Sequence, residues 1–144
     1  ILDLGKVKMS KSLGNTINLS DSSEEIERKV MMMYTDPKHI HVEDPGTVEG
    51  NVVFQYLDIF DPKKEEVEAL KVQYRQGGLG DVVLKKRLIG VLRDFIEPIR
   101  ARRSELEKSR EEVMLIVANS TAEVRLIAQE NMKKMKEVMK IAYF

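Results

Sequence analysis

The sequence predicts an all-helical, bundle-like domain that follows an irregular loop. Three observations support this fold class. Helix-start signals recur along the chain, apolar residues return at helical spacing, and stretches containing Gly and Pro separate the apolar segments. Residues 1–20 lack such periodicity and carry Lys, Ser and Gly, so we expect them to be irregular. Residues 21–144 are expected to form the helical part.

Start and stop signals predict three short helices. Ser22 and Glu25 form a capping box, in which each side chain pairs with the backbone amide of the other residue, and the helix should continue to about Tyr34. An apolar helix is predicted over residues 51–60. A helix over residues 63–76 starts with acidic residues and ends at glycine, an order that suits the helix dipole and a glycine C-cap.

A long helix is predicted from Asp81, which could act as its cap. Its apolar residues form a stripe over four turns, so Leu88 and Phe95 are expected to be buried. Pro98 lies inside this pattern and removes one amide donor, and we therefore expect a kink near Asp94.

The last segment, residues 109–144, repeats the pattern, and its apolar face is expected to pack on the preceding helix. Residues 119–121 have low helix propensity, which predicts a break or a bend. The methionines at helical spacing are interpreted as core residues rather than as a cofactor site. These are Met31, Met32, Met33, Met132, Met135 and Met139.

Composition excludes several classes of protein. The chain has 24 Lys or Arg and 24 Asp or Glu, so its zero net charge provides no bulk attraction to nucleic acid or membrane. Without Cys there is no disulfide framework, thiolate metal site or cysteine nucleophile. No secretory leader and no apolar run long enough for a bilayer is seen, so we expect a cytoplasmic protein with no membrane partner.

Two histidines, His39 and His41, lie in the irregular stretch 36–50. They lack a third ligand at usable spacing, so we expect no metal site and interpret them as exposed loop residues.

The run with the clearest chemistry is Lys8-Met9-Ser10-Lys11-Ser12. Two ammonium groups and two hydroxyls can contact phosphate oxygens, and the glycines on either side allow the backbone to approach a ligand closely. A lysine-rich solvated loop is the alternative for an arbitrary Lys-x-x-Lys pattern. In this order, however, the letters resemble the signature loop of class I aminoacyl-tRNA synthetases.

The rest of the chain extends this resemblance. Its motifs are similar to those in the C-terminal part of bacterial tryptophanyl-tRNA synthetases, over essentially the whole length. The motifs are Leu19-Ser20-Asp21, Tyr34-Thr35-Asp36-Pro37, Asp44-Pro45-Gly46, Val53-Phe54-Gln55-Tyr56, Gly80, Lys85-Lys86 and Phe95-Ile96-Glu97-Pro98-Ile99-Arg100.

The resemblance implies a division of the chain. Residues 1–20 would belong to the edge of a catalytic domain, and residues 21–144 would form a helical tRNA (anticodon)-binding domain. The family's Rossmann-like catalytic domain and its His-Ile-Gly-His motif are missing, since only His39-Ile40-His41 is present. We therefore expect a C-terminal fragment that is inactive alone. A stand-alone helical tRNA-binding module and an interaction domain remain alternatives.

The resemblance also implies substrates and site residues. Lys8 and Lys11 would be catalytic, and the run from Lys8 to Ser12 would bind ATP. In the full-length enzyme ATP and Mg²⁺ would be used to join tryptophan to tRNA(Trp), and the enzyme would be a homodimer. Tryptophan specificity rests on the resemblance alone.

A basic stretch is the candidate tRNA surface. Residues 85–110 hold nine Lys or Arg against four Asp or Glu, a local net charge of +5 (9 − 4). A solvated helix face is the alternative interpretation. The candidate phosphate contacts are Lys86, Arg93, Arg100 and Arg103.

One subgroup of the resembling enzymes holds an iron–sulfur cluster with four cysteines. Aligning the shared motifs places those positions at Asn51, Tyr74, Asp81 and Leu84, none of which can ligate such a cluster. We expect no iron–sulfur cluster, and the anticodon contacts of that subgroup do not carry over.

Overall fold

The computed structural model describes residues 9–141, and in that range it contains only helices and no strand. The all-helical prediction is confirmed. The chain forms two compact units, residues 1–100 and residues 101–144. The elements are the 3-10 turn η1 (Lys11–Leu13) and the helices α1 (Ser23–Met31), α2 (Val52–Phe60), α3 (Lys64–Gln76), α4 (Asp81–Glu107) and α5 (Arg110–Val138).

Local side-chain caps start the first two helices. The predicted capping box of α1 is present: the Glu25 amide donates to Ser22 Oγ at 3.2 Å, and the Ser22 amide donates to Glu25 Oε2 at 2.9 Å. Helix α1 ends at Met31, three residues before the predicted end. Asn51 caps α2, with its Oδ1 accepting from the Val53 amide at 3.0 Å.

A close backbone contact requires glycine after α3. Gly77 has φ +87°, and a Cβ there would lie 2.2 Å from the Glu43 carbonyl oxygen. Helix α4 begins at Asp81 itself and continues through Pro98 without interruption.

The core lies within the first unit and gathers residues from α1 to α4 and the connecting loops. Leu88 is fully buried, as predicted. Phe95 is 48% exposed, so the prediction that it is buried is wrong. It lies one position before Ile96, which takes the inward place on that turn of α4. The largest fully buried side chains include Ile26, Phe54, Leu57, Val67, Tyr74, Leu84 and Leu88.

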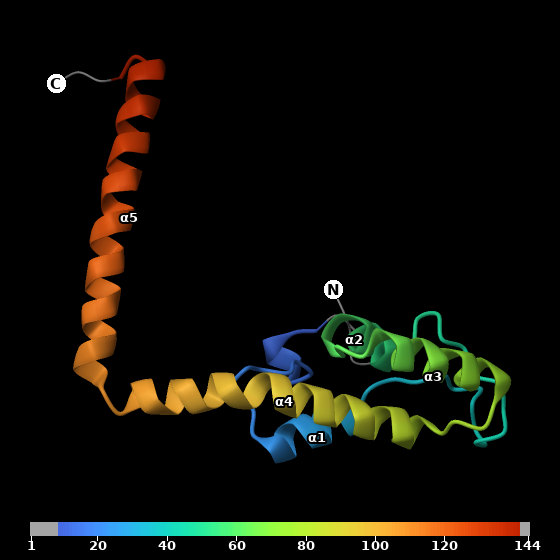
Figure 1. Ribbon diagram of the computed structural model, residues 1–144. Coiled ribbons are helices and arrows are strands. Elements are labelled where there is room, and N and C mark those ends of the chain that lie inside the picture. Colours follow the sequence, from blue (N-terminus) through green and yellow to red (C-terminus); the bar gives the residue numbers. More distant parts are fainter. Residues whose placement is uncertain (1–8, 142–144) are drawn as a thin grey trace. The chain divides into compact units, whose positions relative to one another are not determined.

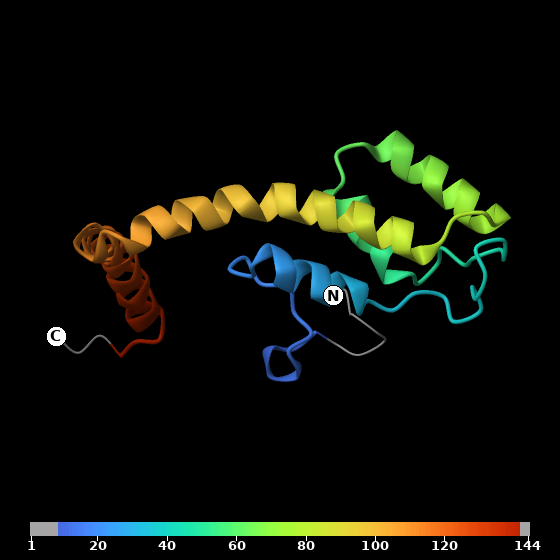
Figure 2. The ribbon, with the colours of Figure 1, turned by 90° about the horizontal axis from the view of Figure 1, so that it is seen from below.

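Within this unit α1 and α3 flank α4 from different sides (Figures 1 and 2). Ion pairs join α4 to each of them. Arg93 contacts Glu27 of α1 at 2.6 Å, and Arg87 contacts Glu66 of α3 at 2.8 Å.

Helix α5 is continuous, and it includes the predicted weak point. Thr121 Oγ1 donates to the Val117 carbonyl at 2.6 Å, which satisfies the hydroxyl inside the helix. None of the α5 residues is buried, contrary to the expected burial of its apolar face. Of the methionines interpreted as core residues, Met33 is buried, whereas the others are exposed.

Candidate functional site

The signature loop is shaped by its own short polar residues. The Ser10 amide donates to Asn15 Oδ1 at 2.7 Å, and the hydroxyls of Ser10 and Ser12 share a hydrogen bond of 2.6 Å. Gly14 ends η1 with φ +63°, and its amide donates to the Lys11 carbonyl at 3.1 Å. These bonds close residues 10–15 into one compact turn.

The loop presents Lys11 and Ser12 to solvent. Both are exposed, Met9 and Ser10 are half-buried, and Lys8 lies outside the described residues. A mobile ammonium on a shaped backbone suits contacts with phosphate oxygens. The loop is attached to α2 at Met9, whose Sδ accepts from the Tyr56 hydroxyl at 3.3 Å.

On its far side the loop is held by buried groups. Ile17 packs against the core. Asp21 and Lys29 form a buried ion pair of 2.5 Å, and Asp21 also accepts from the Asn18 amide at 2.8 Å. Burial by itself raises the pKa of Asp21, but the hydrogen bonds from Lys29 and Asn18 outweigh burial and hold the pKa below the ordinary value of 3.8.

The four candidate tRNA contacts of α4 differ in their surroundings. Lys86 is exposed and forms no ion pair with any residue from 9 to 141. Arg93 donates to Glu27 and, at 3.2 Å, to the Ser23 carbonyl. Arg100 pairs with Glu97 and Arg103 pairs with Glu107, each at 2.8 Å along the helix.

Two other cations of α4, Lys85 and Arg87, bind groups of the protein itself, which the sequence analysis did not predict. Lys85 is buried, and its Nζ donates to the Met31 carbonyl at 2.9 Å. Burial lowers the pKa of Lys85. The available signal was its spacing, because Lys85 lies four residues before the buried Ile89. The predicted local charge of +5 therefore includes cations that do not face solvent.

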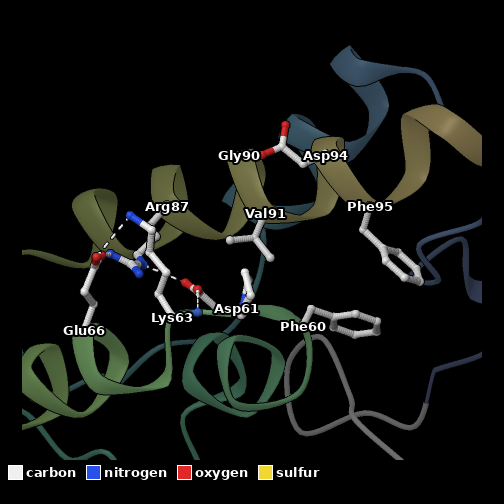
Figure 3. Close-up of a pocket in the computed structure, with 10 residues that line it drawn as sticks. Phe60, Asp61, Lys63, Glu66, Arg87, Gly90, Val91, Asp94 and Phe95 are labelled. Carbon is white, nitrogen blue, oxygen red and sulfur yellow. Dashed lines mark hydrogen bonds and ion pairs between the residues drawn. The ribbon is translucent and has the colours of Figure 1, made fainter.

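Arg87 lines a cavity of about 490 Å³ between α4 and the α2–α3 turn. Figure 3 shows the rings of Phe60 and Phe95 at one end of it and Arg87 with Asp61 and Glu66 at the other. The two ring centroids are 5.3 Å apart. Arg87 Nε donates to Asp61 Oδ2 at 2.7 Å, so the guanidinium is already satisfied by protein carboxylates.

His39 is buried, which corrects the prediction that it is exposed. Its side chain is 3% exposed, with Nδ1 3.6 Å from Asp81 Oδ2 and the ring tilted against Tyr74 at 4.7 Å. Gly46, whose absent Cβ makes room for the Tyr74 ring, helps the loop fold over this point. His41 is exposed, as expected.

Of the four positions matched to the cluster-bearing subgroup, Asn51, Tyr74 and Leu84 are buried, and Asp81 is partly buried. The Tyr74 hydroxyl donates to Asp81 Oδ1 at 2.8 Å and accepts from Asn51 Nδ2 at 3.4 Å, and Leu84 is fully buried. Burial first, and then Asp81, raise the pKa of Tyr74. An amide, a phenol, a carboxylate and an aliphatic side chain do not fit an iron–sulfur cluster.

Metal-binding clusters and membrane-spanning helices are both absent from the described residues. From residue 9 to residue 141, no group of three or more His, Cys, Asp or Glu side chains could hold a metal ion. No described helix is long and apolar enough to cross a membrane.

The signature loop, followed by a helical domain that buries α2 and α4 in one core, defines the class of protein. The family model for tRNA synthetases of class I (W and Y) matches residues 2–97. The chain therefore belongs to this family.

Proteins similar to this chain include tryptophan–tRNA ligases. The chain is 47% identical over 142 residues to the ligase of Streptococcus pyogenes serotype M3, covering 97% of the chain and 42% of that protein. It is 49% identical over 140 residues to the ligase of Clostridium longisporum, with 97% and 41% covered. The chain thus spans less than half the length of the curated relatives that it matches.

A solved structure has the same fold. The tryptophanyl-tRNA synthetase of Campylobacter jejuni superposes with a TM-score of 0.76 at 26% identity, covering 96% of this chain and 44% of that one. A second crystal structure of that enzyme, complexed with ADP and tryptophan, superposes equally well.

Proposed function

We propose that this chain serves as the part of a tryptophan–tRNA ligase that carries the ATP-site lysine loop and the helical tRNA-binding domain. The observation that carries the proposal is the identity of 47–49% over 140–142 residues with ligases of this specificity. The nucleotide and amino acid named for the Campylobacter jejuni complex agree with these substrates. The shape of residues 10–15 supports a phosphate-contacting role for the loop.

In the proposed reaction the tryptophan carboxylate attacks the α-phosphorus of ATP. The bond from that phosphorus to the bridging oxygen breaks, and pyrophosphate leaves with the bonding electrons. The tryptophanyl group then passes to a hydroxyl at the 3′ end of tRNA(Trp), and AMP is released. Lys8 and Lys11 would stabilise the negative charge that develops on the departing pyrophosphate, an interaction that is stronger in the transition state than in the ground state.

The other loop residues would shape the nucleotide site. Ser10 and Ser12 offer hydroxyls, and Met9 offers packing and a backbone amide near the nucleotide. Mg²⁺ would arrive with the triphosphate. Loop closure over bound ATP would exclude water and hold the reactants in one geometry.

The helical domain would contact tRNA through basic residues of α4. Among the candidates, Lys86 is the best placed, because it is exposed and has no ion pair within residues 9–141. Arg93, Arg100 and Arg103 would have to exchange a carboxylate partner for a phosphate. We also propose cytoplasmic action and a homodimeric full-length enzyme.

The test uses a protein in which this chain is joined to the nucleotide-binding part of the family. Tryptophan-dependent exchange of pyrophosphate into ATP, followed by charging of tRNA(Trp), is the expected activity, with tyrosine as the comparison amino acid. The 144-residue chain alone should show no exchange, because it spans only 42% of the length of the ligase that it matches, and catalysis requires tryptophan and ATP to be held in one geometry. Activation of tyrosine in preference to tryptophan would overturn the proposal.

A further inference from the structure

The signature loop contacts the helical core at Met9, which lies between Lys8 and Lys11 in the sequence. The Tyr56 hydroxyl donates to Met9 Sδ at 3.3 Å, across 47 positions of sequence. Nothing in the sequence pattern marks this pair, since Tyr56 belongs to the apolar helix α2 and Met9 to the loop. The contact is therefore a product of the tertiary fold.

Tyr56 is rigidly placed. The residue is 6% exposed, and its ring stacks on Phe60 with centroids 5.9 Å apart and planes 25° apart. Asn51 caps the start of α2, and the neighbouring Leu57 and Val53 are fully buried. The Tyr56 hydroxyl therefore has a fixed position, and the loop forms the contact by bringing Met9 to it.

Met9 is a suitable acceptor in this place. A thioether is a weak hydrogen-bond acceptor on a flexible, polarizable side chain, and it packs well beside aromatic rings. Burial raises the pKa of Tyr56, so the hydroxyl retains the proton that it donates. The resulting contact is weak enough to be broken when the loop moves.

The residues that follow Met9, from 10 to 15, are held together by hydrogen bonds within the loop. The bond from the Ser10 amide to Asn15 and the left-handed Gly14 close the turn that contains Lys11. On the far side, Ile17 and Asp21 attach the chain to the core. Because residues 10–15 are closed into one turn, we expect loss of the contact at Met9 to displace Lys11 together with the turn.

We propose that Tyr56 is a positioning residue that holds the signature loop through Met9 and so sets the position of Lys11. The inference rests on the proposed function for its catalytic meaning, but not for its structural content. Tyr56 touches neither substrate nor reacting atoms in this proposal. It acts only through Met9.

The first test uses the 144-residue chain and does not depend on activity. Trypsin cleaves after Lys11 when the loop opens, and cleavage after the exposed Lys108, between α4 and α5, provides an internal reference. Tyr56→Phe keeps the ring and removes the hydroxyl. The ratio of cleavage after Lys11 to cleavage after Lys108 should rise about 2- to 10-fold, the range for loss of one hydrogen bond.

Two further variants separate positioning from general weakening. Tyr74→Phe removes a tyrosine hydroxyl from the same core away from the loop, and it should leave the cleavage ratio unchanged. Met9→Leu keeps the volume and removes the acceptor. In the Met9→Leu background, Tyr56→Phe should then have no further effect. An unchanged ratio in Tyr56→Phe, or an equal rise with Leu at position 9, would overturn the proposal.

The second test uses the longer protein that carries a nucleotide-binding domain. Tyr56→Phe should lower kcat/KM for ATP about 2- to 10-fold, while the KM for tryptophan stays the same. If the unaltered protein does not activate tryptophan, the proposed function fails, and the cleavage ratio still decides the role of Tyr56. If it does activate tryptophan and Tyr56→Phe changes neither ratio nor kinetics, the positioning role alone fails.

Discussion

The residues of the signature loop have two roles: some supply a positive charge, and others fix the conformation of the backbone. Lys11 is exposed, whereas Asn15 and Gly14 close the turn beneath it. The proposed catalysis requires both groups. Because an ammonium on a long flexible stem gains its precision from the backbone that carries it, the turn matters as much as the charge.

Lys11→Ala tests the charge directly. In a protein with a nucleotide-binding domain, we expect the rate of adenylate formation to fall roughly 10²-fold or more, since one group that stabilises developing charge is lost. Lys8→Ala should behave in the same way. Tryptophan affinity should barely change, and single-turnover kinetics would check both quantities. If tryptophan binding were lost while the activation rate stayed the same, the lysines would not be the groups that stabilise the departing pyrophosphate.

The buried pair of Asp21 and Lys29 sets a second prediction at this scale. The pKa of Asp21 is depressed, so its contribution to stability is present above the ordinary value of 3.8 and is lost as pH falls through the lower folded value. Lys29→Met leaves this carboxylate buried without its cation, a loss of about 3–5 kcal/mol at neutral pH. The deficit should shrink at acidic pH, where Asp21 is protonated.

Urea unfolding of wild type and Lys29→Met at several pH values measures this difference. Arg75→Met is a matched control, because the ion pair of Arg75 with Glu49 is exposed and worth little. A deficit of the same size at pH 3 and at pH 7 would show that the lost packing, rather than the charge, matters.

At the scale of elements, α4 carries the clearest difference between prediction and structure. The apolar stripe lies where its spacing predicts, but the buried part is narrower than predicted, because it leaves out Phe95. Ile96 is buried and Phe95 is half exposed against Phe60. Spacing alone cannot tell which edge of a stripe is covered, because that depends on where the neighbouring helices stop.

This difference predicts unequal costs for two substitutions on one helix. Leu88→Ala should cost about 2–5 kcal/mol if the site cannot collapse. Phe95→Ala should cost roughly half as much or less, since the lost free energy scales with the apolar area that was buried. Chemical denaturation of both variants with a common slope checks the order. A larger cost at Phe95 would contradict the core assignment.

At the scale of the whole molecule, charge is balanced overall and concentrated locally. The chain has zero net charge, and the basic stretch of α4 supplies its candidate tRNA surface. The structure places partners beside much of that charge: Lys85 is buried, and Arg87 is bound by Asp61 and Glu66. Lys86 is exposed and forms no ion pair with any residue from 9 to 141.

We therefore predict different effects on tRNA binding along α4. Lys86→Gln in the 144-residue chain should weaken binding of cognate and non-cognate tRNA alike and flatten the salt dependence by about one unit. Arg93→Gln should have a smaller effect, because Arg93 is engaged with Glu27 and the Ser23 carbonyl. Binding at several salt concentrations measures both, with Arg75→Gln as the control. If Lys86→Gln left the salt dependence of tRNA binding unchanged, this face of α4 would be a solvated helix surface rather than a tRNA contact.

The sequence alone determined where most helices begin and end, and it identified the loop. Capping boxes, glycine ends and the interval of apolar residues depend on a few neighbouring positions. The capping box at Ser22 could therefore be predicted, and the helix that Asn51 caps could be located. The signature run could likewise be recognised from its five letters. These features require no knowledge of distant parts of the chain.

Tertiary structure decided which side chains are available. His39 is buried because Tyr74 and Asp81 come from elements more than 30 positions away, and Lys85 is satisfied by a carbonyl of α1. The Tyr56 contact to Met9 arises in the same way. Burial and hydrogen bonding depend on partners that only folding brings together, whereas local pattern reports only which residues could take part.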